Sequence, residues 1–204
     1  MIVVVRHGET AFNAARILQT SDVPLNERGK SQAALAATRI AALGGTALLS
    51  SDLPRAHMTA QAIAQATGLT IELDPLLQER NFGDLRGKRY DEVGAEIWSA
   101  DYKPPQGESI PEFDARVATA WAAVVQRAAR ADGNLIVVTH GMVCGSIARQ
   151  FLALDAPHTM PGRWGNTSVT ICEKVAPHRV QLLNCVAHLD GAEDSRDGTA
   201  PSGL

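Results

Sequence analysis

The sequence predicts an α/β fold, a three-layer α/β/α sandwich around a mostly parallel sheet. Three short runs, Ile2–Val5, Thr46–Ser50 and Leu135–Thr139, have the continuous apolar, partly β-branched character of strands that are buried on both faces. Helical patterns lie between these runs, and strands that alternate with helices are typical of a parallel sheet covered by helices. No internal repeat and no linker rich in proline or glycine divides the chain.

Composition narrows the class of protein. The 204 residues are 45% hydrophobic and 20% charged with a net charge of -3, as in a globular protein, and no polybasic stripe indicates a nucleic-acid partner. The three cysteines form no CxxC pair, so we expect neither a disulfide framework nor a zinc site, and a reducing cytoplasm fits. The N-terminal apolar run is too short for a signal peptide or a membrane span, so no membrane association is expected.

Capping residues and apolar periodicity predict the two helices that follow the first two strands. Asn26 is the expected N-cap of a helix through "ERGKSQAALAATRIAAL", which Gly44 and Gly45 end. Ser51 or Asp52 is the expected N-cap of a second helix, "LPRAHMTAQAIAQATG", with a proline tolerated in its first turn.

The second half of the chain continues this alternation. A capping box, Ser109 to Glu112, opens a long helix that runs to about Arg130. The pattern then predicts a helix over Met142–Leu152 and strands over Val169–Glu173 and Val180–Val186. We expect one domain over residues 1–190 and, because "GAEDSRDGTAPSGL" is small and polar, a disordered tail over residues 191–204.

Chemically active side chains follow each of the three apolar runs. Arg6 and His7 follow the first run, Arg55 lies in the first turn of the helix after the second, and His140 and Gly141 follow the third. Because ligands of open α/β sheets bind outside the carboxyl ends of the strands, we expect two histidines and two arginines to converge. Two guanidinium groups that face one site favour an anion with several oxygens, phosphate above all. The glycine after each histidine lets the backbone approach such a ligand closely.

The sequence allows two other interpretations, a metal site and a cysteine nucleophile. His7, His140 and a carboxylate could bind a metal ion, but two arginines would repel a dication, and neither HxxxH nor HxH occurs. "CGSIAR", from Cys144 to Arg149, is one residue shorter than the C-x5-R loop of cysteine phosphatases. In a helix its last residue points about 140° away from its first, so Cys144 is predicted to be a buried small apolar residue.

Five stretches occur in a fixed order along the chain: "RHGETAFN", "SDLPRAHMTA", "LLQERNFGDLRG", "PPQGES" and "VVTHG". From about Ile2 to Val186 the chain therefore resembles the histidine phosphatase superfamily, also known as the phosphoglycerate mutase-like family. This resemblance implies a phosphoglycerate mutase-like sandwich. It also implies an enzyme that acts on a small phosphorylated metabolite without a metal ion or another cofactor.

The resemblance also implies a role for each matching residue. His7 is the expected nucleophile, which carries the phosphoryl group as phosphohistidine. Arg6, Arg55 and His140 are the expected phosphate clamp, with Asn13 and Gly141 beside them. Glu79 matches the proton donor, which must be protonated to help the leaving group depart and must later accept a proton from water.

The chain departs from the family pattern at several positions, which keeps alternatives open. Thr20 stands where many members have a glycine, so it is expected either to bind phosphate or to narrow the pocket. Phe82 replaces a tyrosine of the mutase branch, and no arginine pair precedes "PPQGES" to hold a substrate carboxylate. These departures favour a phosphoric monoester hydrolase over a phosphoglycerate mutase-like phosphotransferase. A non-catalytic module that binds a phosphorylated ligand is the alternative of another class.

Overall fold

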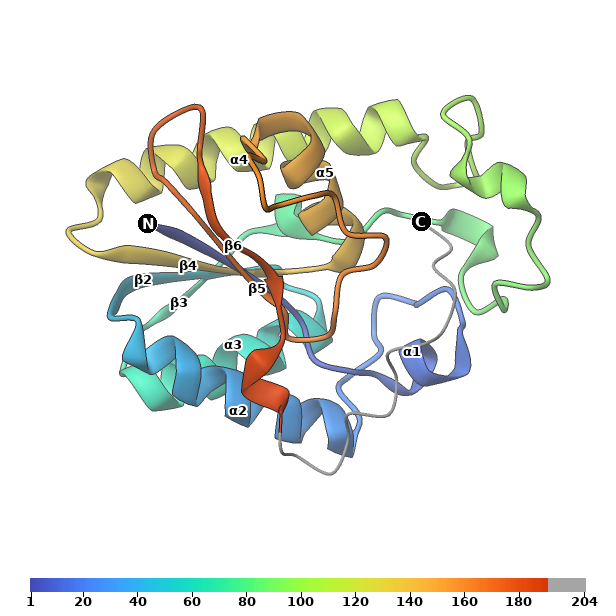
Figure 1. The fold of residues 1–204 in the computed structure, drawn as a ribbon. Coiled ribbons are helices and arrows are strands. Elements are labelled where there is room, and N and C mark those ends of the chain that lie inside the picture. The colour runs from blue at the N-terminus through green and yellow to red at the C-terminus, as the bar shows by residue number, and fades with distance from the viewer. Residues whose placement is uncertain (191–204) are drawn as a thin grey trace.

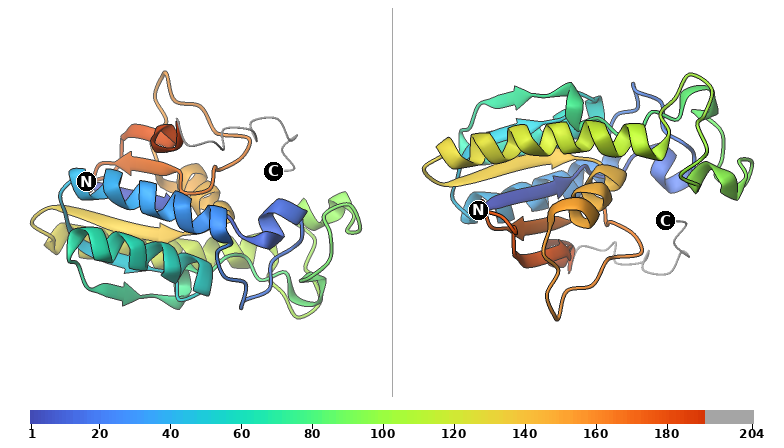
Figure 2. Two further views of the ribbon diagram at one scale, coloured as in Figure 1. Left: turned by 90° about the horizontal axis from the view of Figure 1, so that it is seen from below. Right: turned by 90° about the horizontal axis from the view of Figure 1, so that it is seen from above.

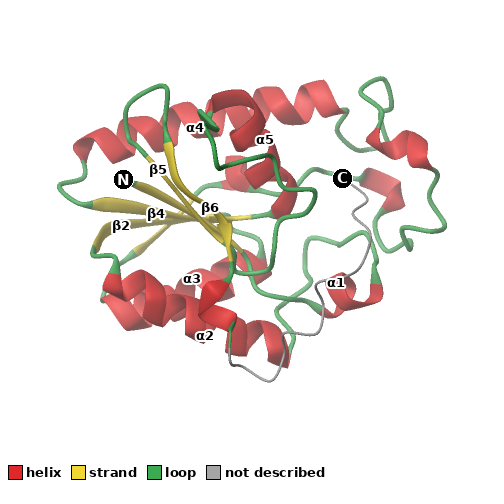
Figure 3. Cartoon of the chain, in the orientation of Figure 1, coloured by secondary structure: helices red, strands yellow, loops and turns green. Residues whose placement is uncertain are grey.

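The computed structural model describes residues 1–190, which form one six-stranded sheet between two layers of helices (Figure 1; Figure 3). The strands are β1 (Ile2–Arg6), β2 (Gly45–Ser50), β3 (Ile71–Leu73), β4 (Asn134–Thr139), β5 (Val169–Cys172) and β6 (Val180–Cys185). The helices are α1 (Ala11–Ala15), α2 (Glu27–Ala42), α3 (Pro54–Thr67), α4 (Ile110–Arg130) and α5 (Gly141–Phe151).

The order of strands across the sheet is β3-β2-β4-β1-β5-β6. The first four are parallel to one another, whereas β5 is antiparallel to β1 and β6 is antiparallel to β5. The predicted three-layer sandwich around a mostly parallel sheet is confirmed. Strand β3 and helix α1, which are short, were not predicted.

Side chains of each strand point alternately to the two faces of the sheet, which explains the two layers of helices. In β1, Ile2 and Val4 pack into the core beneath α4 and α5, whereas Val3 and Val5 face the core beneath α2 and α3. Figure 2 shows these two helix pairs on opposite sides of the sheet. Because both faces of the central strands are covered, β1 is apolar from Ile2 to Val5 and β4 from Leu135 to Val138, which is the pattern of the sequence.

Most helix boundaries follow the predicted caps, but one does not. The Asn26 side chain accepts a hydrogen bond from the backbone N–H of Gly29, and Ser109 forms the predicted capping box with Glu112. Helix α3, in contrast, has Leu53 as its N-cap residue and no side-chain cap. The prediction of Ser51 or Asp52 as its cap is wrong, because the chain stays extended for one more residue before Pro54 starts the helix.

Strand register determines which residues meet at the carboxyl edge of the sheet. Arg6 of β1 pairs with Thr139 of β4, so the next residues, His7 and His140, leave neighbouring strands at the same level. The backbone N–H of Ser51, just after β2, donates to the carbonyl of Val138. Three consecutive strands of the sheet therefore deliver polar residues to one place, to the right of the sheet in Figure 1.

Several expectations are not tested by the fold. The assignment of residues 1–190 to a single domain stays a prediction, and the predicted tail, 191–204, lies outside the described residues. Among residues 1–190, no helix combines the length and the apolar character needed to cross a membrane.

Close contact between two glycines fixes the loop after β1. A Cβ atom at Gly8 would lie 2.5 Å from the carbonyl oxygen of Gly29 in α2, and one at Gly29 would overlap the carbonyl oxygen of Glu9. We expected the missing side chain of Gly8 to admit a ligand. The structure instead shows that it admits a helix, which packs against the backbone of the His7 loop.

We therefore expect Gly29→Ala to destabilise the protein by roughly 1–3 kcal/mol, as overpacking does. The sign of this change in stability is informative, because alanine in place of glycine inside a helix normally stabilises a protein by up to about 1 kcal/mol. Urea denaturation checks this, with Ser31→Ala at an exposed position of the same helix as the control. A more stable Gly29→Ala protein would show that the two backbones are not in contact.

Candidate active site

His7 is held in one orientation and one tautomer. Its side chain is 1% exposed, and its Nδ1 lies 2.6 Å from the carbonyl oxygen of Gly8. Because a carbonyl only accepts, Nδ1 carries the proton. Burial first, and then the charges of Arg55 and Arg6, hold the pKa of the ring well below its usual value. The imidazole is therefore neutral, and its Nε2 carries the lone pair that a nucleophile needs.

His140 lies beside this ring, with the two ring centroids 5.1 Å apart. Its Nε2 is 2.8 Å from the hydroxyl oxygen of Ser51, which also accepts from the backbone N–H of Leu53. Burial, followed by the nearby arginine charge of Arg55, holds the pKa of His140 well below its usual value. If Ser51 donates its proton to Nε2, the neutral ring presents Nδ1–H as a donor, and this nitrogen has no partner among residues 1–190.

Arg6 and Arg55 add two buried guanidinium groups to the two rings. Arg6 donates to the carbonyl of Trp164, and Arg55 donates to the carbonyl of Thr20 at 3.1 Å. Burial is the main cause that lowers the pKa of both groups, to about 10 for Arg55. Within the described part of the chain, neither Nε atom has a hydrogen-bond partner. Buried, charged donors without acceptors are costly, which points to an anion as their partner.

Glu79 is aimed at this group of side chains by backbone donors. Its Oε1 accepts from the N–H of Arg80 at 3.0 Å, and its Oε2 accepts from the N–H of Met142 in the first turn of α5 at 3.1 Å. The charge of Glu79 acts on Arg6 and Arg55, raising the pKa of each against the effect of burial. The side chain of the next residue, Arg80, points elsewhere and donates to the carbonyls of Ile97, Tyr102 and Glu108.

The remaining predicted residues surround the clamp. The Oδ1 of Asn13 accepts from Thr10 at the start of α1 and from the side chain of Asn166. Gly141 packs against Arg6, because a Cβ at this position would lie 3.3 Å from the Nε of Arg6. The carbonyl of Thr20 holds Arg55, while its hydroxyl donates to Asp22 at 2.6 Å. A role for the Thr20 side chain in phosphate binding stays a prediction.

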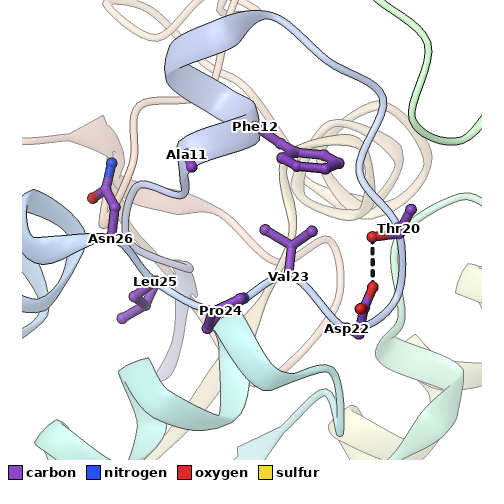
Figure 4. A pocket seen from close by; sticks show the side chains of 8 residues that line it. All are labelled: Ala11, Phe12, Thr20, Asp22, Val23, Pro24, Leu25 and Asn26. Carbon is purple, nitrogen blue, oxygen red and sulfur yellow. Dashed lines mark hydrogen bonds between the residues drawn. The ribbon is translucent and has the colours of Figure 1, made fainter.

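A pocket of about 280 Å³ opens beside Thr20 (Figure 4). Figure 4 shows the ring of Phe12 above Val23, with the hydrogen bond between Thr20 and Asp22 at one side. None of the predicted catalytic side chains lines this pocket. Its lining residues are Ala11, Phe12, Thr20, Asp22, Val23, Pro24, Leu25 and Asn26.

The segment from Trp164 to Ser168 holds Arg6 and His7 from the side of β5. Asn166 donates to the carbonyl of His7 at 3.2 Å, as does the backbone N–H of Thr167. Thr167 has a φ of 55°, which is unusual for a β-branched residue. No sequence motif marks a backbone carbonyl such as that of Trp164 as a partner for an arginine.

His188 supports this segment from behind. Arg39 donates to its Nδ1 at 3.2 Å, so its Nε2 carries the proton and donates to the hydroxyl of Thr167 at 3.0 Å. Thr167 in turn donates to the carbonyl of Asn166. Burial and then the charge of Arg39 lower the pKa of His188 to about 4, so the ring stays neutral and the chain of donors keeps one direction.

Among the described residues, the structure supports neither a metal site nor a cysteine nucleophile. No group of three or more His, Cys, Asp or Glu side chains in residues 1–190 is arranged to hold a metal ion. Cys144 is buried as predicted, and burial raises the pKa of its thiol to about 12, which disfavours a nucleophilic thiolate. The absence of a metal requirement stays a prediction.

Two further arginines extend the positive charge around the clamp. The charge of Arg163 contributes to lowering the pKa of Arg6, after burial, and the charge of Arg86 contributes in the same way at Arg55.

The fold and the site together define an α/β protein with a basic, histidine-containing site at the carboxyl edge of its sheet. The model of the histidine phosphatase superfamily (branch 1) matches residues 2–185. The chain belongs to this superfamily.

The names of similar proteins refer to two activities. The chain is 39% identical over 165 residues to the probable phosphoglycerate mutase GpmB of Escherichia fergusonii, covering 76% of each chain. It is 36% identical over 179 residues to the corresponding protein of Erwinia tasmaniensis, covering 83% of this chain and 82% of that one. Among solved structures, a mycobacterial glucosyl-3-phosphoglycerate phosphatase bound to inorganic phosphate has a TM-score of 0.74 and 26% identity, over 92% of this chain and 98% of that chain.

The neutral rings of His7 and His140 predict a pH dependence of stability. In the unfolded chain both histidines accept protons below a pH of about 6.5, whereas in the fold their lowered pKa values keep them neutral. The unfolded state then binds more protons, so stability is lost as the pH falls through this window, by roughly 1.4 kcal/mol per pH unit for each ring.

Urea denaturation at pH 7.5 and pH 5.5 measures this loss. We expect His7→Asn and His140→Asn each to lose less stability than the wild-type protein over the same step. If all three proteins lose the same amount, burial of these rings is not its source.

Proposed function

We propose that this protein is a phosphatase that hydrolyses a small phosphomonoester through a phosphohistidine on His7. The observation that carries the proposal is the neutral His7 ring, with its Nδ1–H fixed on Gly8, beside buried and unpartnered donors of Arg6, Arg55 and His140. Such donors match the oxygens of a phosphoryl group, and positioning with charge neutralisation supplies most of the catalysis in phosphoryl transfer.

In the first step, the Nε2 lone pair of His7 attacks phosphorus, and the bond from phosphorus to the ester oxygen breaks. The two guanidinium groups and His140 neutralise the non-bridging oxygens of the phosphoryl group. Glu79, protonated at this point, gives its proton to the departing oxygen, because an alkoxide is a poor leaving group. The products are an alcohol and a phosphohistidine.

In the second step, water replaces the alcohol. Glu79 is now a carboxylate and removes a proton from the water as its oxygen attacks phosphorus. The bond from phosphorus to Nε2 breaks, inorganic phosphate leaves, and the protonated Glu79 is ready for the next cycle. Division of one difficult displacement into two easier ones is the advantage of the covalent route.

Two basic side chains near the proline-rich loop, Lys103 and Arg80, already have partners, which favours hydrolysis over transfer of the phosphoryl group within the substrate. Lys103 pairs with Glu112 at 2.6 Å, and Arg80 donates to three backbone carbonyls. Both side chains thus have partners other than a substrate carboxylate, which supports hydrolysis over the reorientation that a mutase requires. The second candidate is nevertheless a phosphoglycerate mutase, which the names of relatives at 36–39% identity favour.

Phosphoglycerates and their glycosides are the first substrates to assay, because the names of both kinds of relative contain them. Incubation with a phosphoglycerate separates the two candidates, since a phosphatase releases inorganic phosphate and a mutase yields the isomer. We include action in the cytoplasm in the proposal, because the cysteines of residues 1–190 are all free thiols.

We expect His7→Ala to reduce phosphate release to background, because the proposed route needs the Nε2 lone pair of His7. Brief incubation of the wild-type protein with a labelled phosphomonoester, followed by denaturation in alkali, should leave label on His7 that acid removes. His158→Ala, at a position outside the site, is the control and should keep full activity. Near-wild-type turnover by His7→Ala would exclude the phosphohistidine route and leave another catalytic mechanism.

We expect chelators to leave activity unchanged, because guanidinium groups and neutral imidazoles supply the charge stabilisation that a metal ion would otherwise supply. Phosphate release before and after dialysis against EDTA measures this. Loss of activity that zinc or manganese restores would contradict the proposal and favour a metal-dependent hydrolase.

A further inference from the structure

Arg116 of α4 lies behind the segment that carries Glu79, and no motif or comparison assigns it a role. Its side chain is 18% exposed, and all five of its N–H donors are engaged. Nη1 donates to the carbonyls of Leu76 and Gln78, each at 2.8 Å, and Nη2 donates to the carbonyl of Glu79 at 3.3 Å. One guanidinium group therefore binds three carbonyls within four consecutive residues.

Within residues 76–79, the carbonyl of Leu77 is the one that Arg116 does not bind, and another side chain donates to it. Thr139, at the end of β4, donates its hydroxyl proton to the carbonyl of Leu77 at 2.8 Å. All four carbonyls from residue 76 to residue 79 accept hydrogen bonds from these two side chains, and none of these bonds belongs to a sheet ladder. The position of the Glu79 backbone is thus set by Arg116 and Thr139.

Glu108 fixes the guanidinium group in turn. Its carboxylate accepts from Nε and Nη2 of Arg116 at 2.7 and 2.8 Å, the two-pronged geometry in which an arginine–carboxylate pair is strongest. The same carboxylate accepts from the backbone N–H of Asn81. Burial raises the pKa of Glu108, but these hydrogen bonds outweigh burial and lower it overall. The residues on both sides of Glu79 are therefore tied to a single ion pair.

We propose that Arg116 is a positioning residue, which holds the segment 76–79 so that the Glu79 carboxylate reaches the oxygen of the leaving group. This inference rests on the proposed role of Glu79 as proton donor and adds the residue that keeps it in reach. Arg116 does not touch the phosphoryl group or substrate. Its loss affects proton donation, whereas nucleophilic attack by His7 keeps its geometry.

The test uses leaving groups of different quality. A good leaving group such as 4-nitrophenolate departs without a proton, whereas an alcohol needs one. We expect Arg116→Lys and Arg116→Gln to lose kcat/KM on an alkyl phosphate by about ten- to a hundredfold more than on 4-nitrophenyl phosphate, within the range that general acid catalysis supplies. The ratio of the two kcat/KM values is independent of how much of a variant is folded, so partial unfolding does not obscure it.

Two comparisons make the result specific. Arg127→Lys and Arg127→Gln change an arginine of the same helix that pairs with Glu72 on the surface, and they should keep the wild-type ratio. Glu79→Gln should change the ratio in the same direction as the Arg116 variants, and the double variant Arg116→Gln/Glu79→Gln should change it no further than Glu79→Gln alone, because both act on one proton.

The outcomes separate the two proposals. If Glu79→Gln leaves the ratio unchanged, Glu79 is not the proton donor, and the proposed function fails at that residue whatever Arg116 does. If Glu79→Gln shifts the ratio but the Arg116 variants lose activity equally on both substrates, or lose none, the positioning role of Arg116 is overturned while the proposed function stands.

Discussion

Burial of the Arg6 and Arg55 guanidinium groups beside two uncharged imidazole rings is the constraint on which the rest of the site depends. Buried charges are costly unless their surroundings compensate them. Here the compensation within residues 1–190 comes from the carbonyls of Trp164 and Thr20 and, when its carboxyl group is ionised, from Glu79. The rings respond in the opposite sense, since the same charges, added to burial, keep them neutral. One arrangement therefore produces both an electropositive site and an uncharged ring at the proposed nucleophile, His7.

Backbone carbonyls, rather than carboxylates, hold most of the functional side chains. The carbonyl of Gly8 orients His7, that of Trp164 orients Arg6, and that of Thr20 orients Arg55. A carbonyl fixes a donor without neutralising it, whereas a carboxylate at the same place would offset the positive charge and compete with a phosphate. This choice of partner leaves the charge of the clamp available to a ligand.

The sequence was sufficient for what depends on local chemistry. β-Branched apolar runs predicted β1, β2 and β4, and the residues after them predicted which side chains would meet. The positions of Ser51, Trp164 and Arg116 could not be predicted, because a hydrogen bond to a carbonyl or to a neighbouring ring leaves no pattern in the chain. Ser51 was one of two residues expected to cap α3, yet it lies against His140, since the register of β2 and β4 brings it there. Only strand order and register, which are tertiary properties, reveal such contacts.

The side chains of the site differ in how the fold anchors them. His7 and His140 come directly from β1 and β4, neighbouring strands that are almost entirely buried, so their separation is tied to the register of the central sheet. Glu79 has no such anchor, because it lies in a segment between β3 and α4 without a ladder of its own. Its backbone is held instead by side-chain donors from β4 and α4. The rings of His7 and His140 are therefore positioned by the sheet, whereas Arg55 is carried by α3 and the Glu79 segment is held by side chains of α4 and β4. Under the proposed function, the nucleophile and the proton donor thus have separate supports, and a change at Arg116 acts on the second.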